Sequence, residues 1–179
     1  MKTNLILTGF SGTGKSRVGE IVAELTGAKF IDIDEQVVMK TGKPIDQIFR
    51  EEGEKHFRGL ETEALRIACK QNGIVVSTGG GTIITNENYI MMKSSGIIVC
   101  LDAKPETIQD RLMSDHKDDL TEVRPLLMVA NPINVITEIK AERMPYYEMA
   151  DFTINTDEIS VDEVALRAIG FWKRKMECK

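Results

Sequence analysis

The sequence predicts an α/β protein in which a parallel sheet is covered by helices on both faces. Apolar runs of strand length alternate with helical patterns along the chain. These runs are apolar at almost every position, as expected for strands that are buried on both faces. A glycine-rich turn lies directly between the first expected strand and the first expected helix, which is the usual place of a phosphate-binding loop.

The expected elements follow one another in a regular order. Strands are expected where the chain reads NLILT, KFIDI, GIVVST, GIIVCL and DFTINT, at residues 4–8, 29–33, 73–78, 96–101 and 151–156. Helices are expected at residues 15–27, 53–73, 86–96, 104–112, 133–150 and 160–176. Right-handed crossovers between parallel strands then bring the carboxyl ends of all strands to one edge of the sheet.

Two regions break this alternation. Residues 35–60 hold helical pieces around the sequence TGKPI. Residues 113–124 are highly charged and contain almost no core-forming side chains. A charged loop of this length is either a mobile functional segment or solvated surface, and its composition alone does not choose between them.

Length and composition limit the class of protein. A chain of 179 residues with 42% hydrophobic and 28% charged residues fits one soluble globular domain. A formal net charge of −5 argues against a broad basic surface for nucleic acid, although it does not exclude small anionic ligands. Three cysteines, Cys69, Cys100 and Cys178, lack metal-like spacing and are expected to be reduced thiols of a cytoplasmic protein.

No segment approaches the roughly 20 consecutive apolar residues that a membrane span requires, and no leader sequence is recognisable. Nothing in the pattern indicates an oligomer. A monomer without membrane or nucleic-acid partners is therefore the expectation.

The strongest functional signal is GFSGTGKS, from Gly9 to Ser16. It fits G-x-x-x-x-G-K-[ST] in the required place between strand and helix. The three glycines let successive backbone N–H groups converge on one concavity, and the following helix adds its positive end. Lys15 can reach the β- and γ-phosphates of a nucleotide, and the Ser16 hydroxyl can ligate Mg²⁺.

Two acids stand two residues apart in FIDID, from Phe30 to Asp34. If this segment is a strand throughout, Asp32 and Asp34 project side by side from the same face. Their mutual repulsion is tolerable beside a divalent cation with bound nucleotide. We expect Asp32 to hold Mg²⁺ through a water molecule and Asp34 to meet a second substrate.

Three consecutive glycines end the strand at STGGG, residues 77–81. Glycine is entropically costly in such a run, so the run suits a place where a ligand lies against bare backbone. A flexible turn at the end of the strand is the alternative.

Three arginines are candidates for anion binding. An arginine fork holds a carboxylate through two parallel hydrogen bonds, and both Arg58 and Arg143 stand in helical patterns, where surface positions are the alternative. Arg124 precedes Pro125, which keeps its backbone extended at the end of the charged loop. An arginine there can swing onto a transferring phosphoryl group, a role worth about 10³–10⁵ in rate.

Together these segments resemble the shikimate kinase family. The resemblance runs in order over nearly the whole chain, through GFSGTGKS, FIDID, IF followed by GEKHFRGLE, STGGG, RPLL and AERMPYY. It implies transfer of the γ-phosphoryl group of ATP to the 3-hydroxyl of shikimate, giving shikimate 3-phosphate and ADP on the route to chorismate. It also implies a three-layer P-loop kinase fold of the nucleoside-monophosphate-kinase type, with five parallel strands in the order 2-3-1-4-5 and a mobile lid.

The resemblance assigns regions and residues as well. One kinase domain would span residues 1–179, with the P-loop at 9–16, a shikimate-binding region at about 33–61 and the lid at about 112–125. ATP would contact Gly12, Thr13, Gly14, Lys15, Ser16, Arg17, Arg111, Arg124 and Asn155, with residues 155–160 beside the adenine. Shikimate would contact Asp34, Arg58, Gly79, Gly80, Gly81 and Arg143, and the catalytic residues would be Lys15, Asp34 and Arg124. One Mg²⁺ would be held by Ser16 and, through water, by Asp32.

One feature departs from the family pattern. The connection MSDHKDDLTEV ahead of Arg124 is longer than usual and carries four acids, which we expect to face solvent because they would repel ATP. Two other functions stay open on the residues alone. A related kinase for gluconate or a nucleotide would not need Arg58, the triple glycine and Arg143 together. A non-catalytic nucleotide-binding module would not need Lys15, Asp34 and Arg124.

Overall fold

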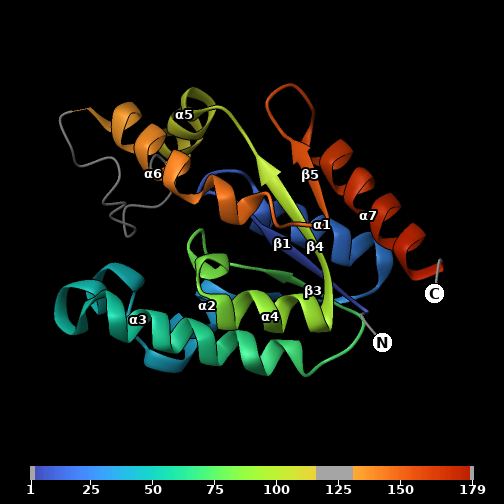
Figure 1. The fold of residues 1–179 in the computed structure, drawn as a ribbon, viewed down its shortest axis with the longest axis horizontal. Coiled ribbons are helices and arrows are strands. Elements are labelled where there is room, and N and C mark those ends of the chain that lie inside the picture. The colour runs from blue at the N-terminus through green and yellow to red at the C-terminus, as the bar shows by residue number, and fades with distance from the viewer. Residues whose placement is uncertain (1–2, 116–130, 178–179) are drawn as a thin grey trace.

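The computed structural model describes residues 3–115 and 131–177, and within them it has the expected parallel sheet with helices around it (Figure 1). The strands are β1 (Asn4–Thr8), β2 (Lys29–Asp32), β3 (Ile74–Ser77), β4 (Gly96–Asp102) and β5 (Phe152–Asn155). The four strand pairs β2–β3, β3–β1, β1–β4 and β4–β5 are parallel. The order β2-β3-β1-β4-β5 confirms the prediction of 2-3-1-4-5.

The helices lie close to their predicted positions. They are α1 (Lys15–Thr26), α2 (Ile33–Thr41), α3 (Ile45–Cys69), α4 (Asn86–Ser95), α5 (Pro105–Asp115), α6 (Pro132–Tyr147) and α7 (Val161–Glu177), with a short 3₁₀ helix, η1, at Thr82–Ile84. Within the described residues, no helix is both long enough and apolar enough to pass through a bilayer.

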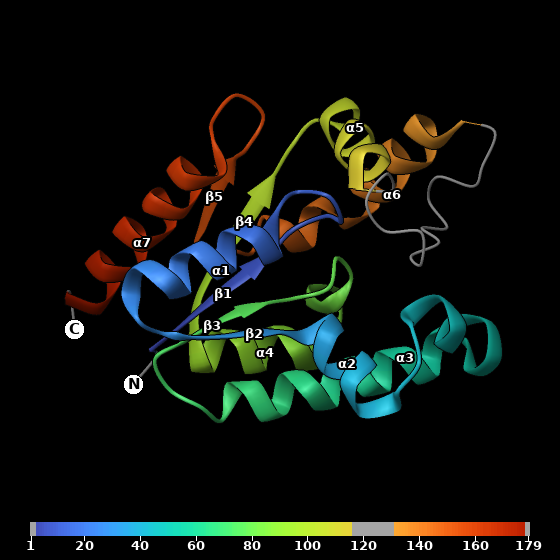
Figure 2. The same ribbon diagram turned by 180° about the vertical axis from the view of Figure 1, so that it is seen from behind.

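The strands divide the core into two apolar layers because alternate side chains point to opposite faces. Along β1, Leu5 and Leu7 join the cluster under α1 and α7, whereas Ile6 joins the cluster under α3, α4, α5 and α6. Figure 2 shows α1 and α7 side by side on one face of the sheet. Cys100 is buried in the second layer and, like the half-buried Cys69, is a free thiol.

The prediction that FIDID is a strand throughout is wrong. Strand β2 ends at Asp32, and α2 begins at Ile33. The Asp32 carboxylate caps the helix, since its Oδ1 accepts hydrogen bonds from the backbone N–H groups of Asp34 (2.9 Å) and Glu35 (3.4 Å). Asp34 therefore lies in the first turn of α2, where the helix dipole favours acids, and it does not share a pleated face with Asp32.

Helix α2 and the first part of α3 lie beside the edge of the sheet where the strands end, whereas the rest of α3 runs alongside α4 (Figure 2). Val37, Ile48 and Phe57 make a separate apolar cluster between α2 and α3. Gly53 interrupts α3 with φ of 82°, so the helix changes direction there. This confirms the helical pieces expected at residues 35–60.

The expected lid falls largely outside the described residues. Of residues 112–125, only 112–115 are described, as the end of α5. Arg124 and the acidic segment ahead of it lie outside, so their predicted roles stay predictions.

Candidate active site

The loop between β1 and α1 has the geometry of a phosphate cradle. Gly9, Gly12 and Gly14 have φ values of 133°, 79° and 90°, a region that favours glycine. A Cβ atom on Gly9 would come within 2.1 Å of the carbonyl oxygen of Leu101, so the loop also lies close against β4. The N–H groups at the start of α1 are thereby available to an anion.

Lys15 and Thr13 hold the loop from inside. The Lys15 ammonium and the Thr13 hydroxyl both donate to the carbonyl oxygen of Phe10, each at 2.8 Å. Burial lowers the pKa of Lys15, while the carboxylates of Asp34 and Asp32 oppose this change. The charged end of Lys15 therefore lies in the cradle and can exchange a neutral carbonyl for a phosphate.

Ser16 and Asp32 form a small set of oxygen donors beside the cradle. The Ser16 hydroxyl donates to Asp32 Oδ2 at 2.6 Å and lies 3.4 Å from the Ser77 hydroxyl. In the described part of the chain, no cluster of three or more His, Cys, Asp or Glu could hold a metal by itself. A hydroxyl and one carboxylate fit Mg²⁺, which takes most of its ligands from water and substrate phosphates.

Asp34 has an unsatisfied acceptor. Its Oδ1 is buried and has no hydrogen-bond partner among the described residues. Burial raises the pKa of Asp34 to about 7; the acids Asp32 and Glu61 add to this rise, and Lys15 and Arg58 oppose it. A carboxyl group in this position gains from a ligand that donates a hydrogen bond to it.

Glu61 is a member of the site that the sequence reasoning missed. Its side chain is fully buried, where its two oxygens accept hydrogen bonds from Arg58 (3.0 Å) and from the Thr82 hydroxyl (2.6 Å). Arg58 also pairs with Glu54 at 3.1 Å, so two carboxylates hold its guanidinium. The signal available was the spacing of three between Arg58 and Glu61 on one helix face.

The triple glycine forms the floor of this site. A Cβ atom on Gly79 would lie 2.5 Å from Glu61 Oε1 and 2.9 Å from Asp34 Oδ1. None of the three glycines has a positive φ, so the backbone conformation would admit other residues. At Gly79 the side-chain oxygens of Glu61 and Asp34 lie so close to the backbone that a Cβ atom would displace them.

The same floor lies between the two predicted carboxylate-binding arginines. A Cβ atom on Gly80 would lie 3.5 Å from Arg143 Nη1, and one on Gly81 would lie 2.6 Å from Arg58 Nη2. Arg143 comes from α6, and its guanidinium lies over the Phe10 ring at 5.5 Å. The structure therefore brings Arg58 and Arg143, which are 85 residues apart (143 − 58), to neighbouring glycines of one turn.

The other residues predicted to contact the nucleotide have partners in different parts of the structure. Arg111 donates to the hydroxyl (2.8 Å) and carbonyl (2.6 Å) of Thr156, at the loop that follows β5. Asn155 is exposed and forms a turn with Asp157. The hydrogen bond of Arg17 goes to Glu20 (3.0 Å) on the exposed side of α1 and not to another predicted site residue.

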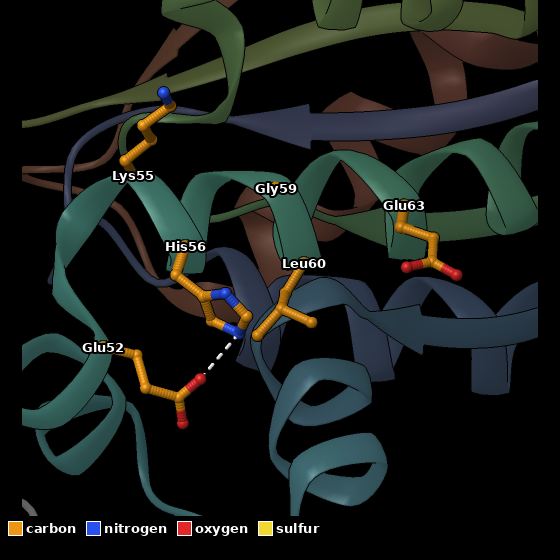
Figure 3. A pocket seen from close by; sticks show the side chains of 6 residues that line it. All are labelled: Glu52, Lys55, His56, Gly59, Leu60 and Glu63. Atoms are coloured by element: carbon orange, nitrogen blue, oxygen red, sulfur yellow. Dashed lines mark ion pairs between the residues drawn. The ribbon is translucent and has the colours of Figure 1, made fainter.

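A separate groove of about 530 Å³ lies on another face of α3, shown in Figure 3. Its lining residues are Glu52, Lys55, His56, Gly59, Leu60 and Glu63. His56 pairs there with Glu52 at 2.8 Å. Positions 56 and 58 differ by about 200° around a helix, so His56 points away from the side of α3 that carries Arg58.

Comparisons with known proteins show the family that the chain resembles over nearly its whole length. The family model for shikimate kinase matches residues 11–173. The chain is 40% identical to shikimate kinase of Thermodesulfovibrio yellowstonii over 96% of this chain and 95% of that protein. It is 38% identical to shikimate kinase of Thermoanaerobacter pseudethanolicus, over 93% of this chain and 94% of that protein.

Solved structures show the same likeness. Shikimate kinase from Acinetobacter baumannii in complex with shikimate superposes with a TM-score of 0.86 at 35% identity, covering 94% of this chain and 92% of that one. Shikimate kinase from Aquifex aeolicus superposes with a TM-score of 0.79 at 30% identity, covering 97% and 98% of the two chains.

Proposed function

The chain belongs to the shikimate kinase family, and we propose that it transfers the γ-phosphoryl group of ATP to the 3-hydroxyl of shikimate at the site described above. One observation carries the assignment of the site. The unsatisfied Asp34 carboxylate lies near the phosphate cradle and beside a glycine floor with an arginine at each of two positions. A phosphate, a hydroxyl and a carboxylate can thus be bound close to one another.

The phosphates of ATP bind in the loop of residues 9–16. Lys15 leaves the Phe10 carbonyl and pairs with the β- and γ-phosphates, and the N–H groups of Gly12, Thr13, Gly14 and Ser16 add hydrogen bonds. Arg17, Arg111 and Asn155 contribute further contacts to the nucleotide. Arg111 is held at Thr156, so its guanidinium can lie against the base or the ribose.

A single Mg²⁺ would be held by the Ser16 hydroxyl and, through water, by Asp32. When bound, it would supply positive charge that offsets the charge on the phosphate groups. The hydrogen bond of 2.6 Å between these two side chains supports the assignment, because it keeps both oxygens within reach of one ion.

Shikimate binds over Gly79, Gly80 and Gly81. Arg58 and Arg143 hold its carboxylate, and Asp34 accepts a hydrogen bond from the reacting hydroxyl. Phosphoryl transfer usually has a loose transition state, so early deprotonation of the hydroxyl contributes little. Orientation can supply about 7–11 kcal/mol, whereas general base catalysis contributes about 10²–10⁴-fold. Asp34 therefore acts first as a positioning group and accepts the proton late.

The remaining predictions belong to the same proposal. Arg124 closes onto the transferring phosphoryl group as part of a lid at residues 112–125, and residues 33–61 form the shikimate-binding region of a single kinase domain. The net charge of −5 favours a protein without nucleic-acid partners. The protein works as a cytoplasmic monomer.

ADP release from Mg-ATP tests the function directly. Purified protein is assayed with shikimate, gluconate, a nucleoside monophosphate or water as the acceptor. We expect release with shikimate alone, and formation of shikimate 3-phosphate can be followed by phosphorus NMR. Equal release with every acceptor would contradict the assignment of the substrate. The Lys15→Met variant controls for contaminating ATPases.

A further inference from the structure

Tyr147 is a buried polar side chain that neither the sequence reasoning nor the proposed mechanism uses. It ends α6, four residues after Arg143, and its side chain is 2% exposed within the apolar layer under that helix. Its hydroxyl donates to the carbonyl oxygen of Gly80 at 2.7 Å. A helix that carries an arginine of the site is thereby linked to the middle of the glycine floor.

Arg143 has fewer charged partners than Arg58 among the described residues. Arg58 pairs with both Glu54 and Glu61. Arg143 has no carboxylate partner in the described ranges 3–115 and 131–177, where its neighbours are the Phe10 ring at 5.5 Å and the Tyr147 phenol, whose pKa its charge lowers.

The Tyr147 hydroxyl can bridge these two groups because it has both a proton and lone pairs. Its proton is donated to the carbonyl oxygen of Gly80, and its lone pairs can accept from the nearby Arg143 guanidinium. Burial raises the pKa of Tyr147 to about 12, although the charge and hydrogen bond of Arg143 oppose the rise. The proton that reaches Gly80 is therefore retained throughout the pH range of an ordinary assay.

Helix α6 itself is anchored elsewhere. Lys140, one turn before Arg143, pairs with Asp102 at 2.9 Å and donates to the carbonyl oxygen of Ala103 at 2.7 Å. Both acceptors lie at the end of β4. Loss of the Tyr147 hydroxyl should therefore leave the helix in place and release only the Arg143 side chain.

We propose that Tyr147 is a positioning residue that sets the Arg143 guanidinium against the glycine floor, and so determines the affinity for the carboxylate of the second substrate. This inference rests on the proposed function, because that function assigns the carboxylate of shikimate to Arg143. The step it adds is that one hydroxyl fixes the relative positions of the arginine and the floor.

Tyr147→Phe tests the inference, because it removes only the hydroxyl and keeps the ring in the core. Tyr146→Phe makes the same chemical change at the neighbouring, exposed position and is the matched control. We expect the KM for shikimate to rise about three- to tenfold, the usual effect of one neutral hydrogen bond. The KM for ATP and the kcat should each stay within about twofold of the wild-type value.

Two further measurements separate positioning from general loosening of the fold. Calorimetric binding of shikimate methyl ester, which lacks the carboxylate charge, should be equal in the wild type and in Tyr147→Phe. In an Arg143→Lys background, Tyr147→Phe should have little further effect, because the group that it positions has been replaced. Additive losses in the double variant, or equal losses for shikimate and its ester, would overturn the inference.

The activity of the wild type distinguishes a failure of the proposed function from a failure of the role of Tyr147. If the wild type fails to phosphorylate shikimate, the proposed function is wrong, and this inference, which rests on it, is overturned with it. If the wild type is active and Tyr147→Phe has an unchanged KM for shikimate, only the role of Tyr147 is wrong. Thermal unfolding of both variants reports whether the fold itself has changed.

Discussion

Replacing Asp34 with asparagine should make the substrate-free protein more stable while removing most of its activity. Burial raises the pKa of Asp34 from 3.8 to about 7; the neighbouring acids Asp32 and Glu61 strengthen this effect, and the cations Lys15 and Arg58 weaken it. The folded protein thus holds the Asp34 proton more tightly than the unfolded chain does, and ionisation of this group destabilises the fold.

The sign and size of the effect follow from these two pKa values. The penalty is absent below pH 3.8, grows as the pH rises towards 7, and is constant above it. Its full value is up to about 4 kcal/mol, at 1.36 kcal/mol for each pH unit. Asparagine is neutral at every pH, so the stabilisation by Asp34→Asn should be about 2–3 kcal/mol larger at pH 8 than at pH 5.

Activity should change in the opposite direction. Wild-type kcat/KM for shikimate should rise with pH through about 7, as Asp34 loses its proton and becomes an acceptor for the substrate hydroxyl. Asp34→Asn should lose about 10²–10⁴ in kcat, and the pH dependence near 7 should disappear with it.

Urea unfolding at pH 5 and pH 8 measures the first effect, and coupled ADP release between pH 5.5 and 9 measures the second. Asp46→Asn is the matched control, because Asp46 also lies in the first turn of a helix. A stabilisation that does not depend on pH would refute the electrostatic reasoning. Turnover close to that of the wild type would refute the role of Asp34 as a base.

Three other predictions follow from the geometry of the site. Gly79→Ala would place a Cβ atom 2.5 Å from Glu61 Oε1 and should lower kcat/KM for shikimate about tenfold or more, with unchanged far-ultraviolet circular dichroism. Wild-type kinetics in this variant would show that the floor can shift freely. Lys15→Met should lower kcat about 10²–10³-fold, while calorimetric binding of shikimate alone is retained; loss of that binding would point to a collapsed site. Asp32→Asn should raise the Mg²⁺ concentration that gives half-maximal rate, and EDTA should stop ADP release by the wild type; an unchanged Mg²⁺ requirement in Asp32→Asn would argue against its place at the metal.

The fold could be predicted because its signals are local and consistent. Runs such as NLILT and GIIVCL have the length and β-branched content of buried strands, and the motif at residues 9–16 requires a strand before it and a helix after it. The strand prediction for all of FIDID is wrong because two local signals compete there. Its alternation of apolar and acidic residues favours a strand, but Asp32 caps a helix, and the capping hydrogen bonds decide where the strand ends.

The spacing of three from Arg58 was a signal for Glu61, but its second partner and the role of Tyr147 could not be assigned from the sequence, because they depend on groups distant in the chain. Glu61 accepts from Thr82, and Tyr147 donates to Gly80. The role of the triple glycine could likewise be predicted only in part. Its spacing indicates close approach to the backbone, but only the fold reveals that Glu61 and Arg58 are the side chains that approach it.

Some charged groups of the site already have hydrogen-bond partners within the protein and others do not. This difference separates supporting residues from residues that bind a ligand. Glu61 and Asp32 have hydrogen bonds on both carboxylate oxygens. Asp34 Oδ1 has none, and Arg143 has no carboxylate partner, among the described residues. A ligand with a hydroxyl and a carboxylate on one ring would satisfy both at once. Substitution of Asp34 should therefore cost affinity and increase stability, whereas substitution of Glu61 should cost both, because it leaves Arg58 and Thr82 without their partner.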